Sequence, residues 1–398
     1  MVELKGKKVI LGVTGGVAAY KSAELTRLLV KAGASVHVVL TEGGARFVTP
    51  VTFQALSGHR VWTDLWDPRM DNNMAHIDLS RDADLIVIAP ATADVMAKLA
   101  NGMCDDLLST LCLARDCPLM VAPAMNRQMW EHPATRRNVA QLCADGVTLL
   151  GPDAGEQACG EVGQGRMLEP DTLYEAICDH FQPKWLAGKT VVMTAGPTFE
   201  SIDPVRGITN SSSGKMGYAL ARACAHAGAR VVLVSGPVSQ PTPFGVERID
   251  VASALQMRDA VMAHVDEADV FIGVAAVADY RPEASAQHKI KKSGEAMTIT
   301  LVPNPDILAE VAARPNPPFC VGFAAESQSL DTYAEGKRQK KAVPMVVGNL
   351  VQDGLGSDEN LVVIYDDHGK HPLPRGGKMG LAQRIVEHLS GLLAKYPL

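Results

Sequence analysis

Short apolar runs alternate with helix-length amphipathic segments along the first half of the chain. KKVILGV (7–13), SVHVVLT (35–41) and ADLIVIAPAT (83–92) are each followed by a small-residue loop and a helical pattern, and CPLMVAPAMN (117–126) and GVTLLGP (146–152) continue the series. This alternation predicts βαβ units and a parallel sheet with helices on both faces. Ligands of such sheets gather beyond the carboxyl ends of the strands.

The same pattern starts again near residue 190. LAGKTVVMTAGP (186–197) has the same pattern of apolar and glycine residues as GKKVILGVTGG (6–16). Segments 224–237 and 29–43 resemble each other in the same way. The stretch before the restart contains Pro183 and Gly188, which is typical of a linker. We therefore predict an α/β protein with two doubly wound, Rossmann-like domains, residues 1–189 and 190–398.

Length and charge narrow the class of protein. The chain has 398 residues and a net charge of −6, which argues against nucleic acid or an anionic membrane as its main partner. The N-terminal lysines and the apolar run after them resemble a signal peptide, but two glycines and a threonine within the run favour a strand and a turn. No apolar run reaches about 18 residues, so no membrane span is expected.

Eight cysteines occur without any CxxC pair, so a structural zinc site is not expected. A chain of this size needs no disulfides for its core, and the thiols are most simply those of a reduced, cytoplasmic protein.

The segment 12–21, GVTGGVAAYK, places Gly15 and Gly16 between a strand and a helix, where backbone N–H groups can hold an anion. The GxGxxG fingerprint and a ribose-binding carboxylate are both absent, which disfavours a nicotinamide oxidoreductase. Thr41, Thr92 and Ser109 offer hydroxyls at further strand-to-helix junctions. A tight turn and simple helix caps are the alternative interpretation of these residues.

Three more residues of the first half are candidates for a catalytic or binding role. His76 is expected in a polar loop, where it could act as a base or be an ordinary surface histidine. Asn126 ends a predicted strand on the ligand side, although its apolar neighbours suit a core. Cys159 lies among glycines in a segment that we expect to be a mobile loop, whereas most cysteines are buried and inert.

Together, GVTGGVAAYK, His76, APATADVMAKLANGMCDDLL (89–108), PAMNRQMW (123–130) and ACGEVGQGRM (158–167) resemble the flavin-containing cysteine decarboxylases. The resemblance implies a flavodoxin-like, trimeric domain that binds FMN through Gly15, Gly16, Thr41, Thr92 and Ser109. It also implies that His76 is the base during flavin oxidation of the cysteine moiety to a thioaldehyde, from which CO₂ is readily lost. Asn126 would hold the substrate carboxylate, and Cys159 would donate the proton that allows the flavin to return to its oxidised state.

The second half has its own polar segments. DPVRGITNSSSGKMG (203–217) brings Arg206, Asn210 and Lys215 before a helix, but its glycine spacing and Met216 exclude a Walker A loop. AAVADYRP (275–282), HKIKK (288–292), NPDIL (304–308) and GKRQKK (336–341) add charged groups near predicted strand ends. These segments could form a triphosphate site, and a generic anion cradle or a solvated lysine run is the alternative.

The order of these motifs resembles bacterial phosphopantothenate–cysteine ligases, which use CTP to form an acyl-cytidylate before joining L-cysteine. By position, Arg206 would hold 4′-phosphopantothenate, Asn210 the acyl intermediate, and Lys289 the charge on the α-phosphate. The expected CTP site comprises Gly273, Val274, Ala275, Asp279, Lys289, Pro305, Asp306, Ile307, Leu308, Phe323, Lys337 and Lys341. Mg²⁺ would bridge the phosphates, with Asp279 as a candidate ligand.

The two resemblances cover nearly the whole chain, in the order found in fused bacterial coenzyme A biosynthesis proteins. They imply a bifunctional enzyme whose ligase product feeds the decarboxylase, with decarboxylase trimers joined by ligase dimers into a possible dodecamer. Gly207 stands where the ligase family often has an aromatic residue, and Ser211 where some members have histidine. A flavin-binding regulatory protein is the alternative function, although His76, Asn126 and Cys159 are all present.

Overall fold

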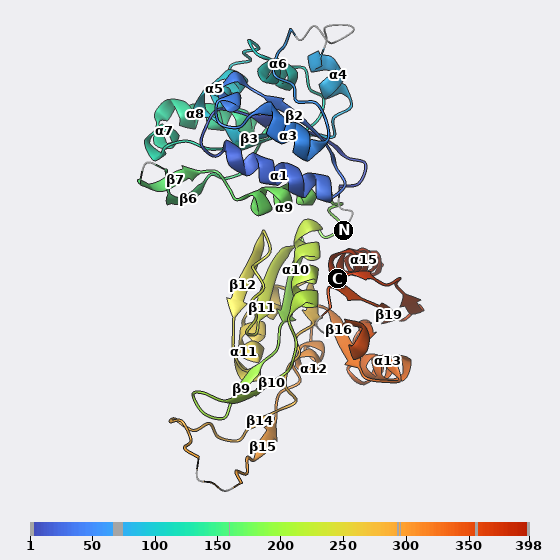
Figure 1. The fold of residues 1–398 in the computed structure, drawn as a ribbon. Helices are drawn as coiled ribbons and strands as arrows, with labels where there is room; N and C mark the ends of the chain where they lie inside the picture. Colours follow the sequence, from blue (N-terminus) through green and yellow to red (C-terminus); the bar gives the residue numbers. More distant parts are fainter. Residues whose placement is uncertain are drawn as a thin grey trace. The chain divides into compact units, whose positions relative to one another are not determined.

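The computed structural model describes residues 4–66, 75–158, 160–292, 294, 296–354 and 357–395. The chain divides into two compact units on either side of the bond between Phe181 and Gln182 (Figure 1). Residues 182–189, which the sequence prediction assigned to the first domain, belong to the second unit. Leu186 is fully buried there and donates its N–H to Ala227 O at 2.8 Å.

The first unit contains a five-stranded parallel sheet in the order β2-β1-β3-β4-β5. Its strands are β1 (Lys8–Val13), β2 (Ser35–Leu40), β3 (Leu85–Ala91), β4 (Leu119–Pro123) and β5 (Thr148–Leu149). This strand order is the flavodoxin-like one, with its switch point between β1 and β3. The predicted doubly wound parallel sheet is confirmed.

Helices cover both faces of this sheet. They are α1 (Ala19–Lys31), α2 (Glu42–Ala45), α3 (Pro50–Ser57), α4 (Ala75–Arg81), α5 (Ala93–Ala100), α6 (Leu107–Leu113), α7 (Arg127–Glu131), α8 (Pro133–Ala144) and α9 (Pro170–Phe181). Because successive strand residues point to opposite faces, Leu11 packs in the core under α1, α3 and α9, whereas Ile10 packs in the core under α4, α5, α6 and α8.

The second unit contains an eight-stranded sheet in the order β12-β11-β8-β13-β16-β17-β19-β20. Its strands are β8 (Thr190–Ala195), β11 (Arg230–Ser235), β12 (Val246–Asp250), β13 (Val270–Gly273), β16 (Phe319–Glu326), β17 (Met345–Leu350), β19 (Val362–Asp366) and β20 (Gly369–Pro372). The first six in spatial order are parallel, and β19 and β20 add an antiparallel edge. The second predicted Rossmann-like domain is therefore also confirmed.

Two helices cover one face of this sheet and three cover the other. Helices α10 (Lys215–His226) and α15 (Lys378–Leu393) share one core, and α11 (Ala254–His264), α12 (Ile307–Ala312) and α13 (Leu330–Lys340) share the second. Smaller elements are β9 (Phe199–Ser201), β10 (Gly207–Thr209), β14 (Tyr280–Pro282), β15 (Leu301–Pro303), β18 (Glu359–Asn360), β21 (Gly376–Gly377), α14 (Val351–Gly354) and a 3₁₀ turn at Val265–Glu267. The β14–β15 pair lies in an arm that extends away from the sheet (Figure 1).

The two units begin with the same arrangement of charges. Asp84, just before β3, accepts the backbone N–H of Lys8 at 2.8 Å and the Lys7 ammonium at 3.0 Å. Asp269, just before β13, accepts the N–H of Thr190 at 2.7 Å and the Lys189 ammonium at 2.9 Å. Each aspartate thus clamps the start of the first strand to the start of its neighbour, and the sequence repeat extends to these contacts.

Two local predictions were wrong. His76 lies in helix α4 and not in a loop, because the helix already begins at residue 75. The glycine-rich stretch expected to be a loop is a strand over residues 162–166, because β7 (Val162–Arg166) pairs with β6 (Asp153–Glu156) in an antiparallel hairpin. Cys159 lies between the two strands and outside the described residues, so its place in a mobile loop stays a prediction. Within the described part of the chain, no helix has both the length and the apolarity to cross a bilayer.

Candidate active sites

Loops that follow β1, β2 and β3 meet at the carboxyl edge of the first sheet. Thr14 Oγ1 donates to Pro90 O at 2.7 Å and accepts the N–H of Thr92 at 3.3 Å. A Cβ added to Gly15 would lie 3.2 Å from the backbone of Gly43, so the first two loops are in close contact. The predicted candidates Gly15, Thr41 and Thr92 therefore occupy one edge of the sheet.

Helix α1 begins at this edge without a side-chain cap, because its N-cap residue is Ala18. The first N–H groups of a helix need an acceptor, and an anionic group is a suitable one. Gly16 has open space where a Cβ would stand, with no atom within 4 Å. The backbone at this turn is suited to a phosphate.

The three predicted hydroxyls all cap helices. Thr41 Oγ1 accepts the N–H of Gly44 at 3.1 Å, and Thr92 Oγ1 accepts the N–H of Val95 at 3.2 Å. Ser109 is buried and completes a capping box with Asp106. The structural interpretation of these residues therefore holds, and contact with FMN stays a prediction for each.

His76 lies in the first turn of α4, which packs against α6. Its side chain is half-buried, and its Nδ1 is buried without a hydrogen-bond partner among the described residues. A buried polar nitrogen without a partner is unusual and points to an exchangeable ligand or a proton.

Asn126 follows the carboxyl end of β4, as expected, where it is the N-cap of α7, and its amide is held from two directions. Its Oδ1 accepts the N–H of Gln128 at 2.8 Å, and its Nδ2 donates to Glu161 Oε2 at 2.8 Å. Donation from Gln128 and Asn126 lowers the pKa of the Glu161 carboxyl. The carboxylate of Glu161 therefore fixes the orientation of the Asn126 amide.

The β6–β7 hairpin is tied to the segment that carries Asn126. Gln157 Oε1 accepts the N–H of Arg127 at 3.1 Å, and Trp130 Nε1 donates to Gln164 Oε1 at 3.1 Å. Cys159 itself lies outside the described residues, between Gln157 and Glu161, which both contact this segment. Sequence reasoning missed Glu161, although it lies two positions from Cys159.

Four other cysteines are buried in the cores. Burial raises the pKa of Cys112, Cys224 and Cys320 to about 12, so these thiols are unreactive at neutral pH. This agrees with a packing role for them.

A cleft opens at the carboxyl edge of the second sheet. Its lining includes Gly196, residues 212–217, Val274, Ala276, Phe323, Ala325, Asn349, Val351, Gly354, Asn360 and Lys378. Helix α10 begins here at Gly214, which has a φ of 73° and offers no side-chain cap. The second unit thus repeats the uncapped helix start that α1 has in the first unit.

Lys378 is a cleft residue that sequence reasoning missed. It is 8% exposed and donates to Gly354 O at 3.0 Å. Burial, and then the charge of Lys215, lowers its pKa. A signal was available in the sequence, because the tetrapeptide GKMG occurs at 214–217 and again at 377–380, and each copy starts a helix in this cleft.

The loop after β13 is held by hydroxyls and by Asn210. Ala275 donates its N–H to Thr194 Oγ1 at 3.2 Å, and Ala278 donates to Thr198 Oγ1 at 3.0 Å. Asn210 Nδ2 donates to Ala276 O at 2.8 Å. Asn210 therefore contacts the loop that follows the predicted residues Gly273, Val274 and Ala275, and CTP binding there stays a prediction.

Arg206 and the segment of Lys289 come together through Asp203. This carboxylate is 1% exposed and accepts the N–H groups of Val205, Arg206 and Ile290 at 2.8, 2.9 and 3.2 Å. Arg206 also donates from its guanidinium to Ile290 O at 3.2 Å. Lys289 is exposed beside this junction, and Asp203 is a positioning residue that sequence reasoning missed.

Gly207 faces the ring of Phe199. A Cβ added at this position would lie 2.4 Å from Phe199 Cζ and 2.8 Å from Glu200 O. Phe199 thus occupies the space into which a side chain at position 207 would project. The structure gives no reason for serine at position 211 in place of histidine.

Lys337 and Lys341 converge on the start of α12. Lys341 forms an ion pair with Asp306 at 2.8 Å, and the ammonium of Lys337 donates to Phe323 O. Burial, and then the charge of Lys341, lowers the pKa of Lys337, while Asp306 and Asp279 act in the opposite direction. The predicted turn of Pro305, Asp306, Ile307 and Leu308 therefore contacts Lys341 through Asp306. The charges of Asp306 and of the exposed Asp279 also act on Lys337.

Two families of known proteins match the chain. Residues 1–182 match the Flavoprotein family, and residues 186–392 match the DNA/pantothenate metabolism flavoprotein C-terminal domain. The chain is 52% identical to the coenzyme A biosynthesis bifunctional protein CoaBC of Vibrio parahaemolyticus over 99% of this chain and 100% of the relative. It is 47% identical to that of Escherichia coli over 98% of each chain.

A solved structure, the C-terminal domain of a coenzyme A biosynthesis bifunctional protein CoaBC, is 38% identical over 54% of this chain and 100% of its own, with a TM-score of 0.47. Both full-length matches extend through the two units. The chain therefore belongs to the family of bifunctional coenzyme A biosynthesis proteins, which combine a flavoprotein phosphopantothenoylcysteine decarboxylase with a phosphopantothenoylcysteine synthetase.

Proposed function

We propose that the second unit activates 4′-phosphopantothenate with CTP and joins the resulting acyl-cytidylate to L-cysteine. The first unit then decarboxylates 4′-phosphopantothenoylcysteine to 4′-phosphopantetheine with FMN. The observation that carries this division is the pair of uncapped helix starts, α1 and α10, each at the carboxyl edge of its own sheet. Each unit thus has a separate place for a phosphate.

In the ligase unit, Arg206 binds the phosphate of 4′-phosphopantothenate and Asn210 binds the acyl intermediate. The hydrogen bond from Asn210 to Ala276 O fixes that amide next to the loop proposed for CTP. Lys289 stabilises the charge that develops on the α-phosphate. Asp203 supports this step, because it holds the segments of Arg206 and Lys289 together.

The CTP phosphates bind toward Lys337 and Lys341. Two ammonium groups close together repel each other, and a polyanion relieves that repulsion. The exposed carboxylate of Asp279 has the hard oxygen donors that Mg²⁺ prefers, and it is the proposed ligand from the protein.

In the decarboxylase unit, the turn at Gly15 and Gly16 holds the FMN phosphate. Bound FMN supplies the reversible oxidation that makes the loss of CO₂ easy. His76 takes a proton from the substrate, and its buried Nδ1, which has no hydrogen-bond partner among the described residues, supports this role. Asn126, oriented by Glu161, binds the substrate carboxylate, and Cys159 returns a proton after CO₂ has left.

Product analysis tests this assignment directly. With CTP, Mg²⁺, L-cysteine and 4′-phosphopantothenate, mass spectrometry should detect pyrophosphate, CMP, CO₂ and 4′-phosphopantetheine, and ATP should replace CTP poorly. The purified protein should be yellow. Colourless protein would refute the FMN assignment, and equal turnover with ATP would refute the CTP assignment.

Matched variants separate the two steps. Cys159→Ser should block formation of 4′-phosphopantetheine and leave ligation intact, whereas Cys143→Ser, which changes an exposed thiol, should affect neither. Lys289→Gln should block ligation but not decarboxylation of preformed substrate, with Lys395→Gln, on an exposed residue outside the proposed sites, as its control. Equal loss of both activities in either test variant would contradict two separate sites.

We also propose that decarboxylase trimers are joined by ligase dimers into a dodecamer in the cytoplasm. Light scattering of the intact protein measures the assembly mass, and a stable monomer would contradict this proposal.

A further inference from the structure

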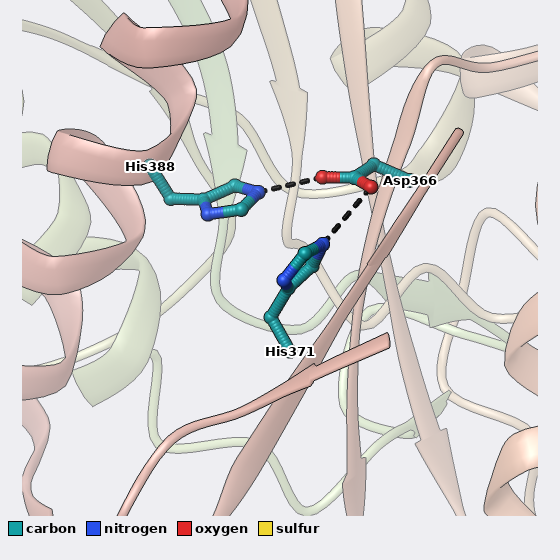
Figure 2. A group of neighbouring side chains, drawn as sticks. All are labelled: Asp366, His371 and His388. Carbon is teal, nitrogen blue, oxygen red and sulfur yellow. Dashed lines mark hydrogen bonds and ion pairs between the residues drawn. The ribbon is translucent and has the colours of Figure 1, made fainter. Parts of the chain in front are cut away.

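Three side chains of the second unit meet at the end of β19, and none of them belongs to the sites above. Asp366 ends β19, His371 lies in β20, and His388 lies in α15 (Figure 2). Nε2 of His371 lies 3.0 Å from Asp366 Oδ1, and Nε2 of His388 lies 2.6 Å from Asp366 Oδ2. Both imidazole rings point their Nε2 atoms at one carboxylate.

The geometry of this cluster suits a single metal ion. One donor atom from each residue lies within 4.8 Å of the other two. Zinc binds imidazole nitrogen and carboxylate oxygen at roughly 2.0–2.2 Å, so three tetrahedral donors lie roughly 3.3 Å from one another. Small rotations of the side chains would therefore place an ion between them.

Asp366 has no lysine or arginine partner among the described residues. The Asp366 side chain is only 1% exposed, and burial of a carboxylate is costly unless a cation or several donors compensate it. The nearby carboxylates Asp367 and Asp331 pair with Arg338 and Lys370 respectively. Asp366, by contrast, faces the two imidazoles and the backbone N–H of His368, which donates to Oδ1 at 2.7 Å.

We propose that Asp366, His371 and His388 bind a divalent transition metal of the zinc class. Two imidazoles and one carboxylate are a donor set that zinc accepts, with the fourth position left to water. The rings of His371 and His388 are 35% and 25% exposed, so water can reach that position. The N–H of His368 fixes the carboxylate, as outer partners of metal ligands commonly do.

This metal is separate from the proposed Mg²⁺ at the nucleotide. Strand β19 runs antiparallel to β17, with Tyr365 opposite Val346 and Val362 opposite Asn349. Asn349 lines the cleft, so Asp366 lies at the other end of the strand pair, near the edge at which β17 begins. The proposed ion stabilises the fold by joining α15 to the β19–β20 edge.

Sequence analysis did not expect a zinc site because the chain has no CxxC pair. Positions 366, 371 and 388 have no recognisable ligand spacing, and the fold alone brings them together.

Cobalt binding to the intact, metal-free protein tests the site. The wild type should bind one equivalent of Co²⁺ at this site, with a visible absorption typical of a tetrahedral or five-coordinate ion. That equivalent should no longer bind tightly in His371→Asn or in His388→Asn. Each variant should weaken binding of that equivalent by at least about tenfold. His368→Ala is the matched control, because it removes a third imidazole of the same hairpin but keeps the backbone N–H. Unchanged binding in both test variants, or no bound equivalent in the wild type, would overturn the proposal.

A second measurement does not depend on the folding of any variant. Zn²⁺ should protect His371 and His388 of the unmodified protein from carbethoxylation, as mapped by mass spectrometry, and should leave His368 reactive. Zn²⁺ should also raise the Tm of the wild type and of His368→Ala but not that of the two ligand variants. If Zn²⁺ leaves the reactivity of each of the three histidines unchanged, the proposal is overturned.

Discussion

Asp203 Oδ2 accepts the backbone N–H of Ile290 at 3.2 Å, across 87 positions of sequence. The same buried carboxylate organises the turn that carries Arg206. The segment of Arg206, proposed to bind 4′-phosphopantothenate, and the segment of Lys289, proposed to bind the α-phosphate of CTP, therefore depend on one side chain. Asp203 need not touch either substrate to have this effect.

Asp203→Asn should slow ligation by roughly tenfold or more, because small displacements of catalytic groups have large effects on rate. Either orientation of the amide would turn an –NH₂ donor toward backbone N–H donors. Initial rates of pyrophosphate release measure the effect, and decarboxylation of preformed substrate should not change. Glu283→Gln, on an exposed residue directly after β14, is the control. Normal ligation in Asp203→Asn would contradict the positioning role.

The same carboxylate predicts a pH dependence. Burial alone raises the pKa of Asp203, but hydrogen bonds from Val205, Ile290 and Arg206 lower it overall. Its contribution to the folded loop is therefore complete above the ordinary carboxyl pKa and disappears as the pH falls through the lower native value. The ligation rate of the wild type should fall as the pH is lowered through this value. The pH–rate profile of Asp203→Asn should lack this decrease.

Glu161→Ala should reduce decarboxylation and leave ligation unchanged. The variant removes the acceptor of the Asn126 amide and a contact between the β6–β7 hairpin and Gln128. We expect kcat for CO₂ release to fall by about tenfold, because the Asn126 amide loses its fixed orientation. Glu156→Ala changes an exposed residue of the same hairpin and should behave as the wild type. Equal rates for the two variants would contradict the role of Glu161.

Lys337→Met should raise the KM for CTP by at least about tenfold, because a half-buried ammonium that meets a phosphate makes a strong charge-assisted contact. Lys340→Met, on an exposed residue of the same helix, should not. Since burial and then Lys341 lower the pKa of Lys337, the affinity of the wild type for CTP should fall as the pH rises through that lowered value. A KM measured from neutral to alkaline pH should rise in the wild type and stay flatter in Lys337→Met.

Gly207→Ala should lower the Tm of the second unit, because the added Cβ meets the Phe199 ring and Glu200 O. Overpacking of this kind costs about 1–3 kcal/mol. The double variant Gly207→Ala with Phe199→Ala should recover part of that loss relative to the sum of the single variants, as calorimetry would measure. Strict additivity would mean that the ring and residue 207 do not compete for space.

Strand starts and the division into two units could be predicted because they depend on local apolar patterns. The seven-residue helix α4 could not, since a helix that short has too little periodicity to distinguish it from the polar residues before it. Asp203 and Glu161 were missed for a different reason. Their partners lie 87 and 35 positions away, and such contacts leave no local pattern.

Lys378 was predictable in principle. The repeated GKMG tetrapeptide indicates two similar helix starts, but only the fold brings both lysines to one cleft. The residues for CTP that were carried over from the family resemblance meet in a similar way, since Lys341 and Asp306 come from different helices.

The aspartate clamps at β1 and β8 have a consequence for how the chain can be divided. Asp84 and the strand start that it holds lie wholly before residue 181, and Asp269 with its partners lies wholly after it. A polypeptide cut between Phe181 and Gln182 would therefore keep both sets of starting contacts. Two separately expressed halves should therefore each fold and melt cooperatively, because neither half needs the other for the contacts that begin its sheet.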